Sequence, residues 1–272
     1  MEDMSSPSTS ITWVDAFTAR PFGGNPAAVC LPETPLADDV MQSLAFELGI
    51  AETAFVSPAD APGEFHLRWF SPTTEIDLCG HATLASAHAM RERGVVDGTS
   101  PITFHTRSGP LIATFDGERI ALNFPATPLT PADLPPDLET EFERSEIVSV
   151  GRTSFFCMVT LTTEAAVRDY QPNVAALTSM PDSALLLTAA AEASSEADYV
   201  LRVFGPRVGI LEDPATGSAQ CAAGPYWSEV LGRPELVVHQ LSPRGAVLHV
   251  RPDGDRVHIA GNAVTVLSGH LC

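Results

Sequence analysis

The chain has 272 residues, 44% of them hydrophobic, which is enough to bury a sizeable core in one large domain or in two halves of ordinary domain size. Thirty-four acidic residues against 15 basic ones give a net charge of -19, which repels phosphate backbones and anionic lipid, so we expect no nucleic-acid or membrane partner. The N-terminal stretch MEDMSSPSTS lacks the basic start and apolar run of a signal peptide, and no apolar stretch is long enough to cross a bilayer, which predicts a cytoplasmic protein.

The cysteines and histidines follow no known metal-binding or disulfide pattern. The five cysteines are odd in number and form no CxxC pair, so we expect reduced thiols. The eight histidines form no HExxH or HxH motif, and the GxGxxG and P-loop patterns are also missing. These patterns predict a protein without a metal ion or a nucleotide cofactor.

The first predicted helix covers residues 36–50, LADDVMQSLAFELGI. Val40, Leu44 and Leu48 recur at a spacing of four, which is typical of the apolar face of a surface helix. Gly49 is the residue type that commonly ends a helix. We therefore expect an amphipathic helix that stops at Gly49.

Glu52 follows this helix among mostly apolar neighbours, in the stretch GIAETAFVSP. A carboxylate in apolar surroundings has a raised pKa and can serve as a general acid or base near neutral pH, a role typically worth ~10² to 10⁴ in rate. Taken alone, the position favours a solvated loop residue. Both interpretations stay open on the local sequence.

Two segments rich in small residues are predicted to be enclosed helices. They are HATLASAHAMRERG after Gly80 and ATGSAQCAAGPYWSEVLG after Pro214. Their opening turns carry Ala, Ser, Cys and Gly on every side, which is typical of a helix surrounded by other structure. A curved sheet around each helix would supply those surroundings.

Strands are expected to dominate the rest of the chain. LIATFDGERIALNF, residues 111–124, and LHVRPDGDRVHIAG, residues 248–261, predict β-hairpins that turn on Asp-Gly. The segment FPATPLTPADLPPDLETEFE, residues 124–143, combines five prolines with a run of acids, so it predicts a linker.

Repeated motifs indicate a diverged tandem duplication. RWFSP at 68–72 matches RVFGP at 202–206, and RSGPLIATFDGERIAL from Arg107 matches RGAVLHVRPDGDRVHI from Arg244. The duplication predicts a first half at 11–124, a linker at 125–143 and a second half at 144–272. The C-terminal strand is free to return to the first half.

The duplication aligns Cys79 with Asp213, so each half carries a potential proton-transfer group just before its enclosed helix. A helix N-terminus carries about half a positive charge and free N–H groups, which favour a bound carboxylate and lower a thiol pKa from its usual ~8.5. The alternative is that Asp77 and Asp213 are N-caps and Cys79 a small buried residue. Occurrence in both halves favours a site.

His81 lies just inside the first of these helix starts. The helix dipole would keep its ring neutral, and the ring could then donate or accept one hydrogen bond. As an isolated observation, a structural histidine is the alternative.

Six motifs together resemble the PhzF-like family of phenazine-biosynthesis isomerases, which has the diaminopimelate epimerase fold. They are VDAFTARPFGGNPAAV, ELGIAETAFV, CGHATLASAHAM, EDPATGSAQCAAGPYW, RGAVLHV and GNAVTV. The resemblance runs along nearly the whole chain in the expected order. It implies an α+β fold of two pseudo-symmetric halves, each a β-barrel-like sheet around a central helix, with the active site in the cleft between them.

The resemblance also implies a cofactor-free isomerase, a homodimer and roles for individual residues. Glu52, in the A-E-T position, would shuttle a proton between carbons of a small carboxylate-bearing, amino-acid-like substrate, as the phenazine enzyme does on a dihydro-hydroxyanthranilate. His81 and Asp213 would assist this transfer. The residues implied to bind substrate are Cys79, Gly80, Gly217 and Ser218, the glycines because they leave the helix N–H groups accessible.

Two other functions remain open at this point. Diaminopimelate epimerases use two opposed cysteines, whereas here only Cys79 matches, so a racemase or epimerase would have to oppose Cys79 to Asp213 or Glu52. The second alternative is a small-molecule-binding protein without turnover. The presence of a glutamate, a histidine and an aspartate at the positions for proton transfer argues against it.

Overall fold

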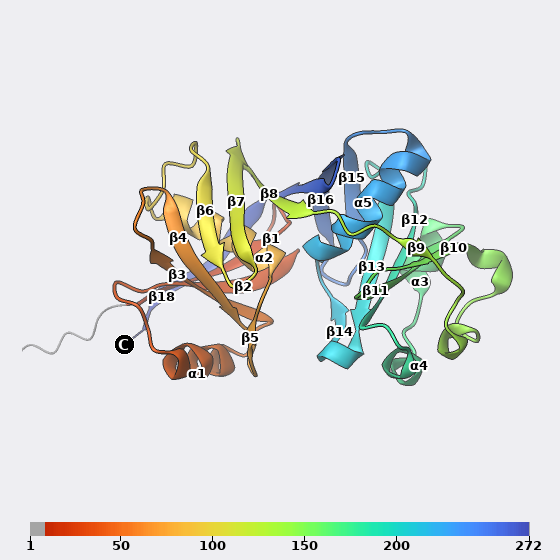
Figure 1. Cartoon of the computed structure of the whole chain (residues 1–272), viewed down its shortest axis with the longest axis horizontal. Helices are drawn as coiled ribbons and strands as arrows, with labels where there is room; N and C mark the ends of the chain where they lie inside the picture. The colour runs from red at the N-terminus through yellow and green to blue at the C-terminus, as the bar shows by residue number, and fades with distance from the viewer. Residues whose placement is uncertain (1–8, 272) are drawn as a thin grey trace, which may run out of the picture. The chain divides into compact units, whose positions relative to one another are not determined.

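In the computed structural model, residues 9–271 are described, and they divide into two compact units (Figure 1). Unit 1 contains residues 9–123 and 260–271, and unit 2 contains Phe124–Ile259. Cys272 and residues 1–8, which make up most of the segment inspected for a signal peptide, lie outside the described residues. No helix in the described part of the chain has the length and apolar character needed to span a membrane.

Unit 1 is a mixed sheet with two helices. The helices are α1 (Asp38–Leu48) and α2 (Gly80–Glu92). The strands are β1 (Ser10–Ala16), β2 (Asn25–Leu31), β3 (Glu52–Pro58), β4 (Glu64–Phe70), β5 (Glu75–Ile76), β6 (Ile102–Thr106), β7 (Gly109–Asp116), β8 (Arg119–Pro125) and β18 (Ala263–His270). Two pairs of strands, β2 with β3 and β4 with β6, are parallel. The pairs β1–β2, β3–β4, β6–β7 and β7–β8 are antiparallel.

Helix α2 is the central helix of unit 1. Every residue from 81 to 90 is buried, and the helix packs against β1, β2, β3 and β18. Five of the six residues from 82 to 87 are alanine, threonine or serine. Such short side chains let strands approach the helix closely on all sides. The enclosed helix that the small-residue pattern predicts is therefore present.

Unit 2 repeats this arrangement. Its longest helix is α5 (Gly217–Leu231), and it also has α3 (Glu164–Asp169), α4 (Val174–Ser179) and short 3-10 turns at Pro136–Leu138, Arg144–Glu146 and Pro206–Val208. Its strands are β9 (Thr130–Pro131), β10 (Ile147–Arg152), β11 (Phe156–Leu161), β12 (Ala184–Ala190), β13 (Tyr199–Gly205), β14 (Ile210–Asp213), β15 (Leu236–Gln240), β16 (Ala246–Asp253) and β17 (Arg256–Gly261).

The two units share one strand pattern. In unit 2 the pairs β11–β12 and β13–β15 are parallel, and β10–β11, β12–β13 and β15–β16 are antiparallel, which is the sequence of directions found from β1 to β7. In both units, a short strand and then the small-residue helix lie in the chain between the two strands of the second parallel pair. The fold is thus α+β with two pseudo-symmetric halves, each a curved sheet around a central helix.

The hairpins also form as the Asp-Gly signals predict. β7 and β8 pair through Asp116 and Arg119, and Gly117 in the turn has φ 58°. β16 and β17 are joined at Gly254, which has φ 62°. Because only glycine adopts such a positive φ without strain, these turns explain the Asp-Gly pairs.

Residues 125–143, for which the prolines predict a linker, are part of unit 2 in the structure. β9 pairs with β10, and the side chains of Leu138 and Phe142 belong to the hydrophobic core of the unit. The proline pattern marks irregular backbone here, but that backbone is packed. At the other end of the chain, β18 returns to unit 1 and pairs with β1.

Helix α1 ends at Gly49, which has the expected left-handed conformation (φ 62°), but its buried face differs from the predicted one. Met41 and Ala45 are buried, whereas Val40 is 46% exposed. Leu44 of the predicted stripe is partly buried and packs against the same core cluster as Met41 and Ala45, so only the Val40 end of that stripe faces solvent.

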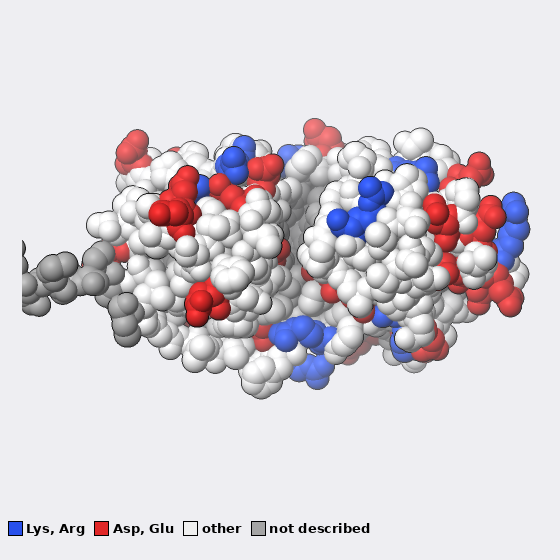
Figure 2. Space-filling view, turned by 90° about the horizontal axis from the view of Figure 1, so that it is seen from below, with Lys and Arg blue, Asp and Glu red and all other residues white. Residues whose placement is uncertain are grey.

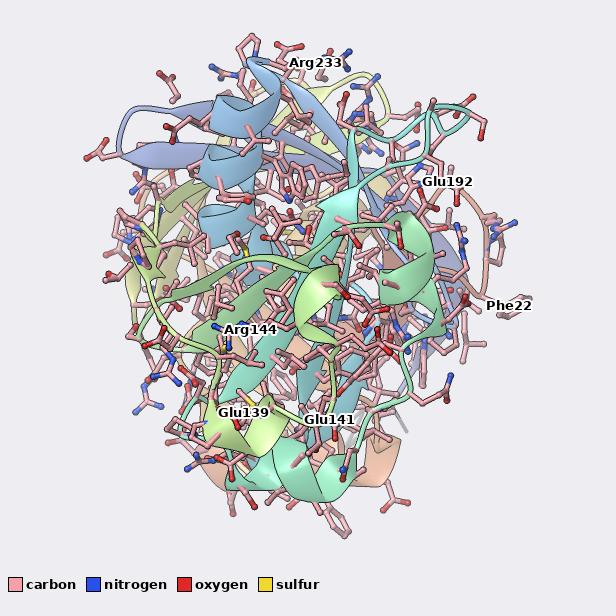
Figure 3. The ribbon with its side chains drawn as sticks, turned by 90° about the vertical axis from the view of Figure 1, so that its right-hand side faces the viewer. Phe22, Glu139, Glu141, Arg144, Glu192 and Arg233 are labelled. Carbon is pink, nitrogen blue, oxygen red and sulfur yellow. The ribbon has the colours of Figure 1, made fainter. Side chains whose placement is uncertain are left out.

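Charged side chains are dispersed over the surface. On the face shown in Figure 2, acidic and basic groups are interspersed among uncharged ones. On unit 2, the exposed residues labelled in Figure 3 include two glutamates, Glu139 and Glu192, and two arginines, Arg144 and Arg233. The net charge of -19 is therefore not concentrated on the surfaces in view.

Candidate active site

Glu52, His81 and Cys79 meet in unit 1, and we call these three residues the proton-transfer cluster. Glu52 is the first residue of β3, Cys79 is the N-cap of α2, and His81 is the second residue of that helix. Oε2 of Glu52 lies 2.9 Å from Nε2 of His81, and Sγ of Cys79 lies 3.5 Å from Nδ1 of the same ring. All three residues are less than 9% exposed, so the solvated-loop interpretation of Glu52 is wrong.

Asn25 completes the surroundings of the ring. It is the first residue of β2, it is fully buried, and its Nδ2 atom lies 3.2 Å from Nδ1 of His81. An amide can present its NH₂ group to a neutral ring or, after a flip, its oxygen to a protonated one. Asn25 can therefore form a hydrogen bond with the His81 ring in either charge state of that ring. The motif analysis did not select it, although it lies in the quoted stretch GGNPAAV.

The charges of the cluster are coupled. Burial disfavours the charged form of His81, but negative charge on Cys79 and Glu52 outweighs this cost and raises the pKa of the ring well above its usual value. Burial raises the pKa of the Cys79 thiol, and the positive charge of His81 opposes this rise only in part. This direction of shift opposes the expectation that the helix dipole keeps His81 neutral, because a carboxylate from β3 lies against the ring.

The loop before Asn25 is held by close backbone contacts. Gly24 has φ 56°, and a Cβ atom there would lie 1.9 Å from the carbonyl oxygen of Ala16. Phe22 also has a positive φ, 69°, and its backbone N–H donates to Oδ2 of the buried Asp15 at 2.7 Å. The Phe22 ring itself projects from the surface (Figure 3) and is 74% exposed. The sequence thus maintains a strained turn to place Asn25 beside His81.

The starts of the two central helices carry no side-chain cap. Cys79 is the N-cap of α2 and Thr216 that of α5, and neither helix start has a side-chain hydrogen bond of the capping kind. The alternative in which Asp77 and Asp213 are N-caps is therefore wrong; Asp77 is exposed and lies 3.8 Å from Arg107. Gly80 and Gly217 are the first helical residues, so the N–H groups of both helix starts are not occupied by a capping side chain.

Asp213 belongs to a separate polar cluster in unit 2. It is the last residue of β14, and its Oδ2 atom accepts a hydrogen bond of 2.5 Å from the Thr216 hydroxyl. Gly217 is buried and Ser218 is exposed at the first turn of α5. The structure therefore groups the predicted residues by unit: Glu52, Cys79, Gly80 and His81 in one, Asp213, Gly217 and Ser218 in the other.

Gln240 holds the Asp213–Thr216 turn and was missed by the sequence analysis. From the end of β15, its Oε1 atom accepts from the Thr216 backbone N–H at 2.8 Å, and its Nε2 atom donates to the Asp213 carbonyl at 2.7 Å. Gln240 is only 1% exposed. The sequence places a glutamine at the end of an apolar stretch, but it does not show that this side chain is buried or which turn it binds.

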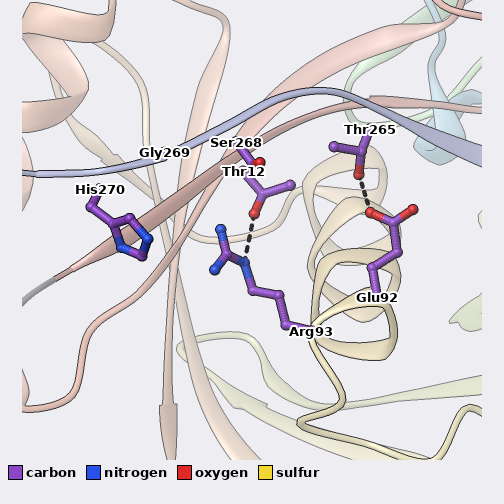
Figure 4. Close-up of a pocket in the computed structure, with 7 residues that line it drawn as sticks. All are labelled: Thr12, Glu92, Arg93, Thr265, Ser268, Gly269 and His270. Atoms are coloured by element: carbon purple, nitrogen blue, oxygen red, sulfur yellow. Dashed lines mark hydrogen bonds between the residues drawn. The ribbon is translucent and has the colours of Figure 1, made fainter.

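A polar cavity of about 370 Å³ lies at the opposite end of α2 from the proton-transfer cluster (Figure 4). Its lining includes Glu92, Arg93 and Thr265, and the Arg93 Nε donates to the Thr12 hydroxyl at 2.9 Å. The cavity does not include Glu52 or His81. It therefore belongs to the junction of α2 with β1 and β18 and not to the proton-transfer cluster.

The proton-transfer cluster suits acid–base chemistry. It combines a carboxylate, an imidazole with a raised pKa and a protonated thiol within direct contact, next to a helix start whose partial positive charge favours anions. A carboxylate can accept a proton from carbon and return it, and a charged imidazole can stabilise the negative charge that develops meanwhile.

Comparisons with known proteins agree with this chemistry. The model of the phenazine biosynthesis-like (PhzC–PhzF) family matches residues 14–269. A protein of Halalkalibacterium halodurans named as an uncharacterized isomerase is 41% identical over 97% of this chain and 98% of its own length. A PhzF family protein of Enterococcus faecalis, solved by crystallography, superposes with a TM-score of 0.91 at 34% identity, over 97% of this chain and 99% of that one.

A more distant likeness concerns the fold alone. A hydroxyproline epimerase of Agrobacterium vitis superposes with a TM-score of 0.64 at 11% identity, over 98% of this chain and 93% of that one. The two-half architecture is therefore shared with epimerases. With a family model that covers most of the chain and relatives named as isomerases, the chain is an isomerase that belongs to the phenazine biosynthesis-like, or PhzF-like, family.

Proposed function

We propose that the chain is a cofactor-independent isomerase that moves a proton on a small carboxylate-bearing, amino-acid-like substrate, with Glu52 as the proton shuttle. The observation that supports this most is the buried contact of 2.9 Å between Oε2 of Glu52 and Nε2 of His81. A carboxylate removed from water and placed beside an imidazole is the arrangement that enzymes use for proton abstraction from carbon. The unreactive binding protein is set aside because the family consists of isomerases.

The proposed reaction needs one base. Glu52 takes a proton from one substrate carbon and becomes a carboxylic acid, whose proton exchanges with solvent, and it then gives a proton to another carbon. Between these steps the substrate carries the negative charge, which the protonated His81 ring and the uncapped start of α2 stabilise. The substrate carboxylate would bind the free N–H groups of a helix start.

Asp213 and Ser218 enter the proposal through the family resemblance. We propose that they orient the same substrate, and Gln240 supports this role because it fixes the turn that carries Asp213. We also retain the homodimer implied by the resemblance as part of the proposal.

A racemase or epimerase is the second candidate, and one observation favours it. The Cys79 thiol lies in the cluster itself, 3.5 Å from the His81 ring, and its raised pKa makes it a proton donor at neutral pH. A thiol acid and the Glu52 base would invert a stereocentre if they acted on opposite faces of the substrate. A single Glu52 shuttle would return the proton to one face.

Deuterium exchange tests these candidates. The protein is incubated in D₂O with dihydro-hydroxyanthranilate and a panel of amino acids, and proton NMR follows exchange at carbon. The Glu52 shuttle predicts that Cys79→Ala retains exchange without inversion, whereas the epimerase predicts that this variant loses exchange. Exchange that survives in Glu52→Gln would contradict the shuttle.

A further inference from the structure

The proton-transfer cluster also has the composition of a metal site. Glu52, Cys79 and His81 each offer one ligand atom, and these atoms lie within 4.8 Å of one another. Among the described residues, no second group of three such donors gathers within reach of one ion. A carboxylate, a thiolate and an imidazole are all ligands of Zn²⁺ in proteins.

A tetrahedral ion at this cluster requires the Cys79 side chain to rotate toward Nε2 of His81. With zinc-to-ligand bonds of ~2.0 to 2.3 Å, neighbouring ligand atoms of a tetrahedral site lie roughly 3.4 to 3.6 Å apart. Nε2 of His81 lies 2.9 Å from Oε2 of Glu52 and 3.9 Å from Sγ of Cys79, on either side of this range. Nε2 is the ring nitrogen beside Glu52, whereas Sγ lies closer to Nδ1, at 3.5 Å, so an ion on Nε2 gains the Cys79 ligand only after that rotation.

The Glu52 carboxylate oxygen lies directly beside Nε2 of His81. Although Oε2 and Nε2 are 2.9 Å apart, they are not aligned as a hydrogen bond, and Oε2 is a buried acceptor without one. An ion on the ring axis would have the carboxylate oxygen beside it as a second ligand. The amide of Asn25 would then accept the Nδ1–H proton with its oxygen, the support that a metal-bound histidine usually has.

Charge balance favours an ion with two positive charges. A thiolate and a carboxylate neutralise Zn²⁺, and binding releases the thiol proton. Three protein ligands also leave a fourth position open, as in catalytic rather than structural zinc sites. A water molecule or the substrate carboxylate could occupy that position.

We propose that the proton-transfer cluster binds one Zn²⁺ or a similar thiophilic divalent cation, and that the bound ion stops proton transfer because it occupies the carboxylate of Glu52. Metal binding stands on the geometry of the donors, whereas the inhibition rests on the proposed function. A single residue separates Cys79 from His81 at the start of α2, but Glu52 comes from strand β3. For this reason the cysteine and histidine spacing predicted no metal.

Cobalt provides the test, because Co²⁺ bound to a thiolate gives a near-ultraviolet charge-transfer band. The full-length chain, reduced with a phosphine and stripped of metal by a chelator, is titrated with Co²⁺ and then with Zn²⁺. We expect one Co²⁺ per chain, the thiolate band, and displacement of Co²⁺ by Zn²⁺. Absence of the band, or a band that persists in Cys79→Ala, would overturn the site.

Two variants and a control separate the ligands from general effects. Cys79→Ala should weaken binding by at least about 100-fold, since loss of a second-shell partner alone typically weakens metal binding 10- to 100-fold. Glu52→Gln should weaken binding while the thiolate band remains. Cys221→Ala removes a similarly buried thiol of unit 2 and should bind Co²⁺ as the unmodified chain does.

The failure of each proposal has its own signature. Zn²⁺ binding at one ion per chain together with loss of deuterium exchange supports both. Zn²⁺ binding that leaves exchange intact would contradict the role of Glu52 as the shuttle but not the metal site. Exchange that depends on Glu52 in a chain that binds no Co²⁺ would overturn the metal site alone.

Discussion

The charge of His81 depends on Glu52, which lies far from it along the chain, as well as on its neighbour Cys79. Its place at a helix start favours a neutral ring, but β3 brings Glu52 to 2.9 Å and the preceding turn brings Cys79 to 3.5 Å. Burial lowers the pKa of the ring and these two neighbours raise it by more. The local sequence shows that His81 lies at a helix start, but it does not show that β3 brings Glu52 beside the ring. The direction of this pKa shift could therefore not be predicted from the sequence.

The raised pKa of His81 predicts a pH dependence. Because the pKa in the folded state lies above the unfolded value of 6.5, the charge pairing stabilises the fold fully below about pH 6.5 and is lost as the pH rises through the folded-state pKa. In Glu52→Gln the pKa of His81 should fall. Nitrogen-15 NMR of the histidine rings, assigned with His81→Gln, measures both midpoints. A midpoint of 6.5 or lower in the unmodified chain would contradict the coupling.

Motifs located the charged members of the site better than the amides. Glu52, Cys79 and His81 lie in short stretches whose composition is unusual for their position, and the structure brings all three together. Asn25 and Gln240 leave no such signal, because an uncharged amide alters neither the charge nor the apolar period of its strand. Their roles depend on pairing between distant segments.

At the scale of elements, one ion pair recurs in the two units. Arg68 of β4 binds Glu75 through two hydrogen bonds, at 2.7 and 2.8 Å, and Arg202 of β13 binds Glu212 in the same way, at 2.8 and 2.9 Å. Each arginine also stacks on a phenylalanine two residues later. The shared pair joins corresponding strands, and we propose that it descends from the duplication that the RxFxP repeats indicate.

The two copies should differ in energetic weight. The Arg202 side chain is 8% exposed and also donates to the carbonyls of Val167, Arg168 and Tyr170, whereas that of Arg68 is 32% exposed. Arg202→Met leaves a buried carboxylate without its partner and should lower the free energy of unfolding by about 3 to 5 kcal/mol. Arg68→Met, the matched control, should cost about 1 kcal/mol or less. Urea denaturation compares them, and equal losses would contradict the assignment.

Sequence patterns predicted elements well where local chemistry decides. Both Asp-Gly hairpins and the end of α1 at Gly49 form as expected, because a positive φ at glycine is a local requirement. The buried face of α1 contains Met41 and Ala45, with Leu44 of the predicted stripe at its edge, because tertiary contacts with β3 and β4 select this face. The packing of residues 125–143 also depends on such contacts.

At the scale of the molecule, unit 1 is discontinuous and unit 2 is continuous in the chain. β18 pairs with β1 from Ala16 opposite Ala263 to Ser10 opposite His270, and it also packs against α2. Unit 1 is therefore incomplete without residues that follow unit 2. The repeats predict a second half at 144–272, whereas unit 2 is Phe124–Ile259. They could not fix the partner of the last strand, because strand pairing is not encoded by distance along the chain.

This connectivity predicts how fragments behave. Residues 124–259 contain a complete core and should fold alone, with a cooperative thermal transition in circular dichroism. Residues 1–123 lack β18, which leaves one edge of β1 and part of α2 uncovered, so this fragment should not show such a transition. A cooperative transition in the 1–123 fragment would contradict the role of β18.

Membership of an isomerase family and the chemistry of one buried cluster together support the account of function. Its central claim is that Glu52 carries the proton. The control is Glu64→Gln, which removes the carboxylate of another glutamate that pairs with a histidine, His105, on neighbouring strands of the same unit. Glu64 and His105 are about 40% exposed, so this pair lies outside the buried cluster.

The decisive measurement is the initial rate of deuterium incorporation into the responding substrate in D₂O, for the unmodified chain, Glu52→Gln and Glu64→Gln. Loss of a general acid–base group should lower the rate in Glu52→Gln by about 10² to 10⁴-fold, while Glu64→Gln retains it. An equal rate in Glu52→Gln and Glu64→Gln, with both variants folded, would contradict the assignment of Glu52 as the proton shuttle.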